Sequence, residues 1–211
     1  NAILGNDRAI VSSQPGTTRD ALDTPLTYNE KQLLLIDTAG IRRRGKVAPG
    51  IEKYSVLRSL RAIYRADVAF ILLDATELVA AQDTHIAGQV SDTYTGAVVL
   101  VNKWDQAPEL GLDQADVLEL VRTRLKFMPY APIRFISAIQ KRGIDEAINA
   151  ALMVYEERTK RITQKQLRST VMAAMAEHPP PGKGRRFLRL RRVVQQEVNP
   201  PTFTFYVNDP K

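Results

Sequence analysis

The 211-residue sequence contains no cysteine and only two histidines. Without cysteine the chain can form no disulfide, no thiolate zinc site and no cysteine nucleophile, and such a composition suits a reducing compartment. His85 and His178 lie far apart in the sequence, so a histidine metal cluster is not expected. No apolar run approaches the roughly 20 residues that a membrane-spanning helix needs, and we expect no membrane partner.

Acidic residues are scarce in only one part of the chain. Residues 1–158 hold 19 basic and 20 acidic side chains, whereas residues 159–211 hold 11 basic and 3 acidic ones. The formal net charge of +7 therefore comes from the C-terminal part. Such asymmetry predicts a polyanionic partner, and RNA or DNA fits better than a membrane because no lipid anchor or apolar face accompanies the charge.

The phosphate-loop motif G-x-x-x-x-G-K-[ST] is also missing. The Gly-Lys pairs at residues 45–46 and 182–183 are followed by Val47 and Gly184, and neither residue carries the hydroxyl that the motif requires.

Short apolar runs alternate with longer helical patterns over residues 1–158. Runs at 31–36, 68–73, 96–101 and 133–136 are typical of strands buried on both faces of a parallel sheet, and residues 24–28 suit an additional edge strand. Helical periodicity marks residues 52–65, 83–94, 113–127 and 143–158. This alternation predicts a doubly wound α/β sheet, in which ligands bind at the carboxyl ends of the strands.

The pattern changes from about residue 159. Residues 165–175 are predicted to be helical, and the Pro- and Gly-rich run at 179–184 ends that helix. Residues 187–194 and 202–207 are predicted to form two strands joined across residues 199–201. We expect a separate small α+β unit that carries the basic charge.

Two motifs in the N-terminal part suit phosphate and magnesium binding. In the DTAG sequence at 37–40, Asp37 can hold Mg²⁺ through a water, and the Gly40 N–H can approach a terminal phosphate. In the GTTRD sequence at 16–20, the Thr18 hydroxyl can bind Mg²⁺ directly, and Thr17 or Thr18 can sense the γ-phosphate. Taken alone, DTAG is more typical of a plain turn between a strand and a loop, and the alternative for GTTRD is an ordinary Gly-Thr turn.

Two further motifs follow predicted strands and suit guanine. In the NKWD sequence at 102–105, the Asp105 carboxylate can accept both donors of the guanine edge, which adenine does not present. Asn102 can tie neighbouring loops together, and the Lys103 stem can lie over the purine face. The backbone N–H groups of Ser137 and Ala138 can face the guanine carbonyl.

The order GTTRD, DTAG, NKWD and ISA resembles that of the TrmE–Era–EngA group of GTPases. Residues 37–60 (DTAGIRRRGKVAPGIEKYSVLRSL) and 199–210 (NPPTFTFYVNDP) are similar to the second GTPase domain and the KH-like domain of the Der (EngA) family, and the likeness covers essentially the whole chain. The resemblance implies a P-loop-NTPase-type GTPase domain at 1–158 and a KH-like domain at 159–211. It also implies a monomeric, cytoplasmic bacterial protein that hydrolyses GTP to GDP and acts in assembly of the large ribosomal subunit.

The sequence departs from the family pattern at both ends. The family has two GTPase domains, and its phosphate loop precedes the segment that begins here at Asn1, so we expect a chain that starts after that loop. We also expect a KH-like domain that is incomplete at Lys211. The alternative is a GTPase-like scaffold that contacts RNA or the ribosome without hydrolysing GTP.

The resemblance also bears on catalysis and metal ions. Ile41 stands where a Ras-type GTPase has a water-orienting Gln, so no catalytic residue can be assigned. Relatives with this replacement commonly use K⁺, which makes K⁺ a candidate cofactor beside the Mg²⁺ expected at Thr18 and Asp37.

Basic residues outside these motifs are candidates for contact with ribosomal RNA. The run at 42–44 lies in the expected second switch, where it can contact rRNA or another domain of a longer parent protein, or form a solvated loop. No G-x-x-G loop marks the C-terminal unit, which favours protein contact or contact with rRNA phosphates over sequence reading. The candidate contact residues are Arg42, Arg43, Arg44, Lys183, Arg185, Arg186, Arg189 and Arg191.

Overall fold

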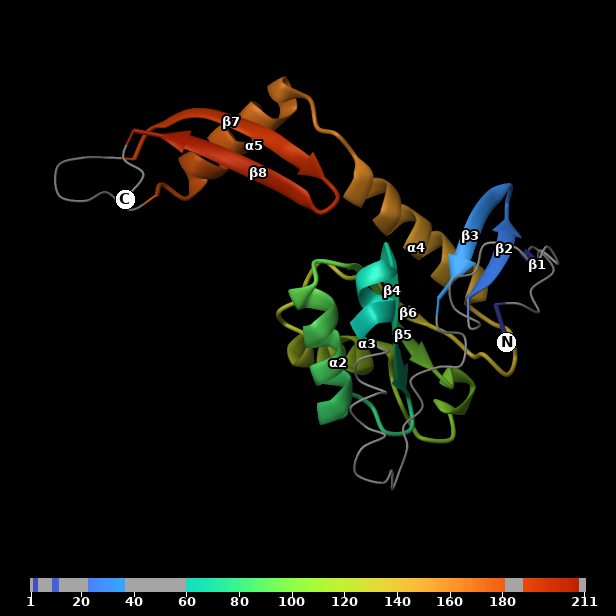
Figure 1. Cartoon of the computed structure of the whole chain (residues 1–211). Coiled ribbons are helices and arrows are strands. Elements are labelled where there is room, and N and C mark those ends of the chain that lie inside the picture. The colour runs from blue at the N-terminus through green and yellow to red at the C-terminus, as the bar shows by residue number, and fades with distance from the viewer. Residues whose placement is uncertain (1, 4–8, 12–22, 37–59, 181–187, 209–211) are drawn as a thin grey trace, which may run out of the picture. The chain divides into compact units, whose positions relative to one another are not determined.

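The computed structural model describes residues 2–3, 9–11, 23–36, 60–180 and 188–208, and the chain divides into two compact units (Figure 1). The first unit is Asn1–Val154 and the second is Tyr155–Lys211. The division falls inside helix α4 (Ile144–Thr159), close to the boundary that the sequence predicts after residue 158.

A three-stranded parallel sheet forms the centre of the first unit. Its strands are β4 (Val68–Asp74), β5 (Gly96–Asn102) and β6 (Ile133–Phe135), in the order β4-β5-β6. The register pairs Asp74 with Asn102, and Val101 with Phe135. The carboxyl ends of all three strands therefore lie at one edge, as the predicted α/β sheet requires.

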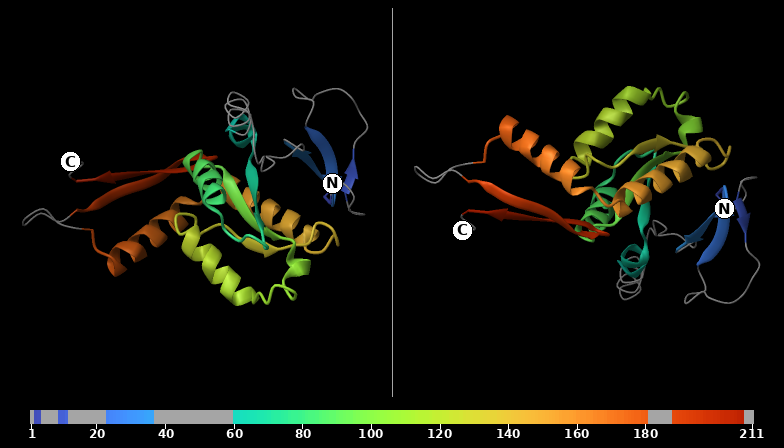
Figure 2. Two further views of the ribbon diagram at one scale, coloured as in Figure 1. Left: turned by 90° about the horizontal axis from the view of Figure 1, so that it is seen from below. Right: turned by 90° about the horizontal axis from the view of Figure 1, so that it is seen from above.

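Helices cover both faces of this sheet, as Figure 2 shows. Alternate residues of β5 enter two apolar clusters, because successive side chains of a strand point to opposite faces. Val99 packs with residues of α2 (Ala81–Asp92) and α3 (Gln114–Arg124), and Val98 packs with residues of α4. The predicted doubly wound arrangement is confirmed for these strands.

Helix starts follow the expected capping chemistry. The side chain of Asp113 accepts hydrogen bonds from the Ala115 N at 2.7 Å and the Asp116 N at 3.3 Å, so it satisfies two backbone donors at the first turn of α3. Residues 60–65 are helical, which agrees with the end of the helix predicted at 52–65, and the rest of that segment lies outside the described residues.

A second, antiparallel sheet contains β1 (Ala9–Val11), β2 (Thr24–Tyr28) and β3 (Lys31–Leu35), in the order β1-β2-β3. Asn29 and Glu30 have positive φ angles of 46° and 65°, as a two-residue hairpin turn requires.

The expectation that residues 31–36 are buried on both faces of a parallel strand is wrong. Among the described residues β3 pairs only with β2, and the pairing is antiparallel. Leu33 and Leu35 pack against the cluster on the α4 side, whereas Leu34 is 49% exposed. The three consecutive leucines therefore do not mark two buried faces.

The second unit combines α5 (Gln164–Glu177) with an antiparallel hairpin of β7 (Leu190–Val198) and β8 (Pro201–Val207). This confirms the predicted helix and strand pair, but the strands are joined across residues 199–200, because Pro201 already belongs to β8 and pairs with Val198.

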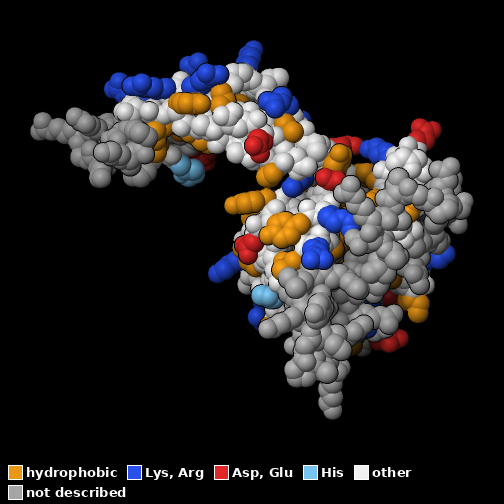
Figure 3. All heavy atoms as spheres, viewed as in Figure 1, with side chains coloured by type: hydrophobic (Ala, Val, Ile, Leu, Met, Phe, Trp, Pro, Cys, Tyr) orange, Lys and Arg blue, Asp and Glu red, His pale blue; other side chains and the backbone are white. Residues whose placement is uncertain are grey.

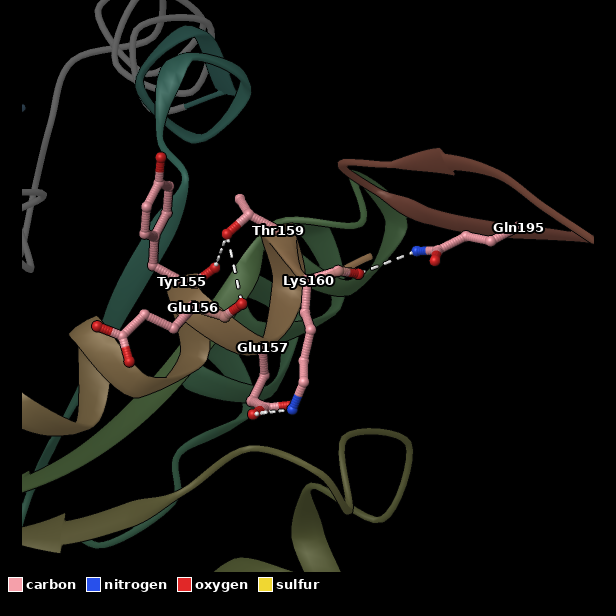
Figure 4. Close-up of polar contacts among 6 residues, drawn as sticks. All are labelled: Tyr155, Glu156, Glu157, Thr159, Lys160 and Gln195. Atoms are coloured by element: carbon pink, nitrogen blue, oxygen red, sulfur yellow. Dashed lines mark hydrogen bonds and ion pairs between the residues drawn. The ribbon is translucent and has the colours of Figure 1, made fainter. Parts of the chain in front are cut away.

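Gln195 of β7 fixes the segment that leads into α5. Its Oε1 accepts from the Ile162 N at 2.8 Å. Its Nε2 donates to the Lys160 O at 3.1 Å, the bond that Figure 4 draws between Gln195 and Lys160. The Thr163 side chain then caps α5 by accepting from the Gln166 N at 3.3 Å. The buried amide of Gln195 thus connects β7 to the segment before α5 through two hydrogen bonds.

No helix in the described parts of the chain combines the length and apolarity that crossing a bilayer demands.

Candidate functional site

Loops that follow β4, β5 and β6 are joined by backbone hydrogen bonds at the carboxyl edge of the parallel sheet. The Ala75 N donates to the Asn102 O at 2.9 Å, and the Trp104 N donates to the Ile136 O at 3.0 Å. The NKWD segment after β5 is therefore held between the loops that follow its two neighbours.

The Asn102 side chain makes a further connection between loops. Its Oδ1 accepts a hydrogen bond from the Ala138 N at 3.0 Å. The segment after β5 and the segment after β6 are thus tied by a side chain as well as by the backbone, in the way expected of Asn102.

Lys103 adopts a left-handed backbone with φ of 63° and immediately precedes the short helix η1 (Trp104–Gln106). Its Nζ lies 2.8 Å from Asp74 Oδ2 at the end of β4. The Thr76 N and hydroxyl both donate to the other oxygen of this carboxylate, at 3.0 and 2.7 Å. The lysine stem is thereby anchored at its charged end.

The ionised form of Asp74 is favoured in this setting. Burial raises the pKa of Asp74, but hydrogen bonds from Lys103 and Thr76, together with the positive charge of Lys103, outweigh that effect and hold the pKa below its ordinary value. Sequence reasoning assigned no role to Asp74, because its pairing with Lys103 follows from the register of β4 against β5.

Asp105 differs from its neighbours in having an unsatisfied acceptor. Its Oδ1 is buried and has no hydrogen-bond partner among the described residues. An ionised carboxylate can only accept, so this oxygen needs a donor from outside the described part of the chain.

Asp105 also lines a cleft of about 440 Å³. Trp104, Gln140 and Arg142 contribute to the same cleft, and sequence reasoning proposed none of them for the site. Trp104 packs against Phe135 with ring centroids 4.4 Å apart, so it shapes the wall beside Asp105. The residue with the unsatisfied acceptor therefore belongs to the lining of this cleft.

The N–H groups of Ser137 and Ala138 are already used inside the protein. The Ser137 N donates to the Arg142 O at 3.0 Å, and the Ala138 N donates to Asn102 Oδ1. Ser137 is 3% exposed, and its Oγ accepts from the Gln140 N at 3.2 Å. In this structure the pair holds the loop in place, and its contact with a guanine carbonyl stays a prediction.

Gly143 closes the same loop. Its φ is +74°, and a Cβ on it would lie 2.6 Å from the Phe135 O. The positive φ and the short distance to the Phe135 O both exclude a residue with a Cβ at this position. Glycine therefore allows the chain to pass close to β6 directly before α4 begins at Ile144.

Several predicted site residues lie outside the described residues. Nothing in the structure therefore places the phosphate and magnesium candidates or part of the basic set. Among the described residues no group of three or more His, Asp or Glu side chains is placed to hold a metal ion. The residues outside are Thr17, Thr18, Asp37, Gly40, Ile41, Arg42, Arg43, Arg44, Lys183, Arg185 and Arg186.

The described basic candidates lie at the start of the hairpin in the second unit. Arg189 directly precedes β7 and Arg191 lies within it, and both are exposed. Figure 3 shows Lys and Arg side chains gathered along one edge of this unit. The sequence-derived charge asymmetry is therefore present on the folded surface.

Comparison with known families matches both parts of the chain. Residues 1–103 match the family described as 50S ribosome-binding GTPase. Residues 161–211 match the C-terminal KH-domain-like family of EngA bacterial GTPase enzymes.

Curated relatives match over the whole length. GTPase Der of Thermomicrobium roseum is 46% identical over 213 residues, which cover 100% of this chain and 46% of the relative. GTPase Der of Chloroflexus aggregans is 47% identical, covering 99% of this chain and 47% of the relative. The chain thus spans about half the length of the curated relatives it matches.

Solved structures support the same fold. Era in complex with MgGDPNP and a segment of 16S ribosomal RNA is 27% identical with a TM-score of 0.55, covering 73% of this chain and 50% of that chain. Era of Aquifex aeolicus bound to GDP·AlF4⁻ matches with the same identity, coverage and TM-score. From the two family matches and the whole-length relatives, the chain is a homologue of the Der (EngA) GTPases that covers part of the second GTPase domain and the KH-like domain.

Proposed function

We propose that the first unit binds the guanine base of GTP or GDP at the cleft beside Asp105. The observation that carries this proposal is the buried Oδ1 of Asp105, which has no hydrogen-bond partner in the described parts of the chain. Guanine offers an N1–H and an exocyclic amine side by side, which match two carboxylate oxygens. Adenine lacks this pair of donors and would leave the buried oxygen unsatisfied, at a cost of about 1–3 kcal/mol.

Lys103 and Asn102 would support the same base. The Nζ of Lys103 is held by Asp74 at 2.8 Å, which fixes the apolar stem of the lysine as a surface for a purine face. Asn102 would keep the Asp105 segment and the Ser137 segment at a constant separation through its bond to the Ala138 N.

Phosphate and metal binding are proposed from the motifs alone. The Asp37 carboxylate and the Thr18 hydroxyl suit Mg²⁺, and the Gly40 N–H suits a terminal phosphate. Hydrolysis of GTP to GDP is proposed for the longer protein to which the relatives correspond. Ile41 offers no group that could orient water, and K⁺ stays a candidate cofactor on the resemblance alone.

The second unit is proposed to contact the large ribosomal subunit through rRNA phosphates. The support is the excess of 11 basic over 3 acidic side chains in residues 159–211, and the exposure of Arg189 and Arg191. A phosphate-based contact weakens steeply with salt because bound counterions are released. A role in large-subunit assembly in the bacterial cytoplasm, as a monomer, is part of this proposal.

One observation favours a second candidate for the chain itself. No G-x-x-x-x-G-K-[ST] sequence occurs in the 211 residues, and such a loop supplies backbone N–H groups and a lysine to the phosphates. The alternative is a guanine-binding and ribosome-binding module that does not hydrolyse GTP. Phosphate release by the chain at saturating GTP and Mg²⁺ separates the two, since sustained turnover would exclude the alternative.

The base-recognition proposal is tested by the substitution Asp105→Asn. The amide replaces one acceptor by a donor, so GDP binding should weaken by about 1.5–3 kcal/mol while binding of xanthosine diphosphate improves. Isothermal titration of both nucleotides against wild type and variant measures this exchange.

Glu109→Gln is the matched control, because Glu109 is an exposed carboxylate in the same loop. It should leave both affinities unchanged. Equal GDP affinity in wild type and the Asp105 variant would remove Asp105 from the base site.

A further inference from the structure

The two strands of the second unit have one face that α5 covers and one that it does not. Val193 and Gln195 point to the covered face, where they are 1% and 8% exposed. The side chain of Gln195 is hydrogen-bonded to the Ile162 N and the Lys160 O, in the segment that leads into α5, which places the helix on that side. Since side chains of a strand alternate, Arg192 and Val194 point to the opposite face.

The register of the hairpin brings an aromatic ring to the same face. Arg192 pairs with Tyr206, and Val194 pairs with Thr204. Directly opposed residues of an antiparallel pair share a face, with their Cβ atoms about 5 Å apart. Tyr206 is 46% exposed, so much of its side chain remains accessible.

A break in the regular register adds a second arginine. Leu190 pairs with Val207 and Arg192 with Tyr206, which leaves Arg191 as the extra residue of a bulge. In a bulge two residues of one strand oppose one residue of the other. Arg191 and Arg192, both exposed, therefore stand against the single Tyr206, and the described part of the chain gives neither an ion pair with a carboxylate.

This set of side chains suits an unpaired nucleotide. A tyrosine ring supplies a flat surface on which any base can stack, and arginine supplies a bidentate partner for phosphate oxygens. A base within a duplex presents neither of its faces, so stacking of this kind selects single strands or looped-out bases. A protein partner would use the same exposed ring but would not prefer the unpaired strand.

We propose that the arginine–tyrosine face, formed by Arg191, Arg192 and Tyr206, binds single-stranded RNA by stacking a base on Tyr206 while the two guanidinium groups hold the adjoining phosphates. The inference rests on the proposed ribosomal contact and deepens it by naming the form of RNA and the residues that take it. It adds one arginine, Arg192, and one aromatic residue, Tyr206, to the RNA-contact candidates suggested by the sequence.

The test measures fluorescence anisotropy of a labelled 10-nucleotide RNA, as a single strand and as a duplex, with the full 211-residue chain. Tyr206→Ala should weaken single-strand binding about fivefold or more and leave duplex binding nearly unchanged, whereas Tyr206→Phe should keep the wild-type affinity for both. The phenylalanine variant keeps the ring, so it separates lost stacking from lost structure.

Arg192→Gln tests the phosphate contact. It should weaken binding and reduce the slope of log K against log salt by about 0.7 for the single strand. Arg168→Gln is its matched control, because Arg168 is an exposed arginine on α5, the helix that packs on the covered face. This control removes the same charge and should leave the slope unchanged.

The outcomes distinguish failure of this inference from failure of the proposed function. If wild type binds RNA and Tyr206→Ala binds both forms equally well, the stacking site is wrong while the ribosomal contact stands. If wild type binds neither form at low salt, the proposed contact with rRNA is itself overturned. If RNA binding is unchanged in Tyr206→Ala and Arg192→Gln but ribosome co-sedimentation is lost, the face binds ribosomal protein and the RNA inference is overturned.

Discussion

Two buried polar groups, one in each unit, differ in whether their hydrogen bonds are satisfied among the described residues. Gln195 in the second unit is 8% exposed, and both ends of its amide are hydrogen-bonded, to the Ile162 N and the Lys160 O. Asp105 in the first unit has a buried oxygen without a partner among the described residues.

This difference separates a structural role from a binding role. A buried polar group with all its hydrogen bonds stabilises the fold in which it is placed, because its loss leaves the partner groups unsatisfied. A buried acceptor without a partner costs free energy in the unbound protein and recovers it when a ligand supplies the donor. Gln195 thus fixes the approach to α5, whereas the Asp105 oxygen has no partner among the described residues, and the proposed guanine contact would supply one.

The largest change in stability is expected when the fully hydrogen-bonded side chain of Gln195 is replaced. Gln195→Leu leaves the Ile162 N–H and the Lys160 carbonyl without their partner, and should lower the free energy of unfolding of the second unit by about 2–4 kcal/mol. Urea unfolding followed by circular dichroism measures the change. Gln196→Leu, at the exposed neighbouring position, is the control and should shift stability by no more than about 0.5 kcal/mol.

A smaller loss is expected for Asn102→Ala in the first unit. The substitution removes the bond from the Ala138 N, which should cost about 0.5–1.5 kcal/mol of stability and loosen the Asp105 segment. Unfolding measurements and GDP titration on one preparation test both parts. Unchanged GDP affinity beside reduced stability would limit Asn102 to a structural role.

The opposite sign is expected for Asp105→Ala. Removing an unsatisfied buried oxygen should leave the free energy of unfolding unchanged or raise it by up to about 1 kcal/mol, whereas guanine nucleotide binding is lost. Thermal unfolding without nucleotide, compared with GDP titration, shows the two effects side by side. A clear loss of stability would mean that Asp105 has a structural partner, and the contrast with Gln195 would fail.

The smallest effect is expected in how the stability contributed by Asp74 changes at acidic pH. The pKa of Asp74 is lower in the folded chain than its ordinary value of 3.8, so its contribution to stability is present above about pH 4 and is lost as the pH falls through the folded-state pKa. Asp74→Asn should therefore be less stable than wild type at neutral pH, with a difference that shrinks toward pH 3. Lys103→Met should reduce the same pH dependence, and a pH-independent difference would contradict the assignment.

The sequence predicted the central part of the fold well because its signals are local. The apolar runs of β4 and β5 and the helical periodicities depend on residues close together in the chain, and the structure confirms them. The tie through Asn102 followed from a motif whose geometry is set by its position after a strand.

Features that depend on pairing between distant segments could not be predicted. The run at 31–35 shows three leucines, but only the register with β2 decides that Leu34 faces outward. The pair of Asp74 and Lys103, and the meeting of Arg192 with Tyr206, likewise follow from strand registers that no local pattern reveals. Single-residue register shifts exchange the two faces of a strand, so side-chain neighbours across a sheet are a property of the fold.

The left-handed backbone of Lys103 has a consequence for the kinetics of nucleotide exchange. A non-glycine residue at a φ of 63° is disfavoured by about 1 kcal/mol, and the ion pair with Asp74 helps to hold it there. The conformational cost of shaping this segment is then met when the protein folds, so a nucleotide bound as proposed above would not have to meet that cost. If association at such a segment proceeds without a rearrangement step, differences in affinity among nucleotides would arise almost entirely from how fast each one leaves.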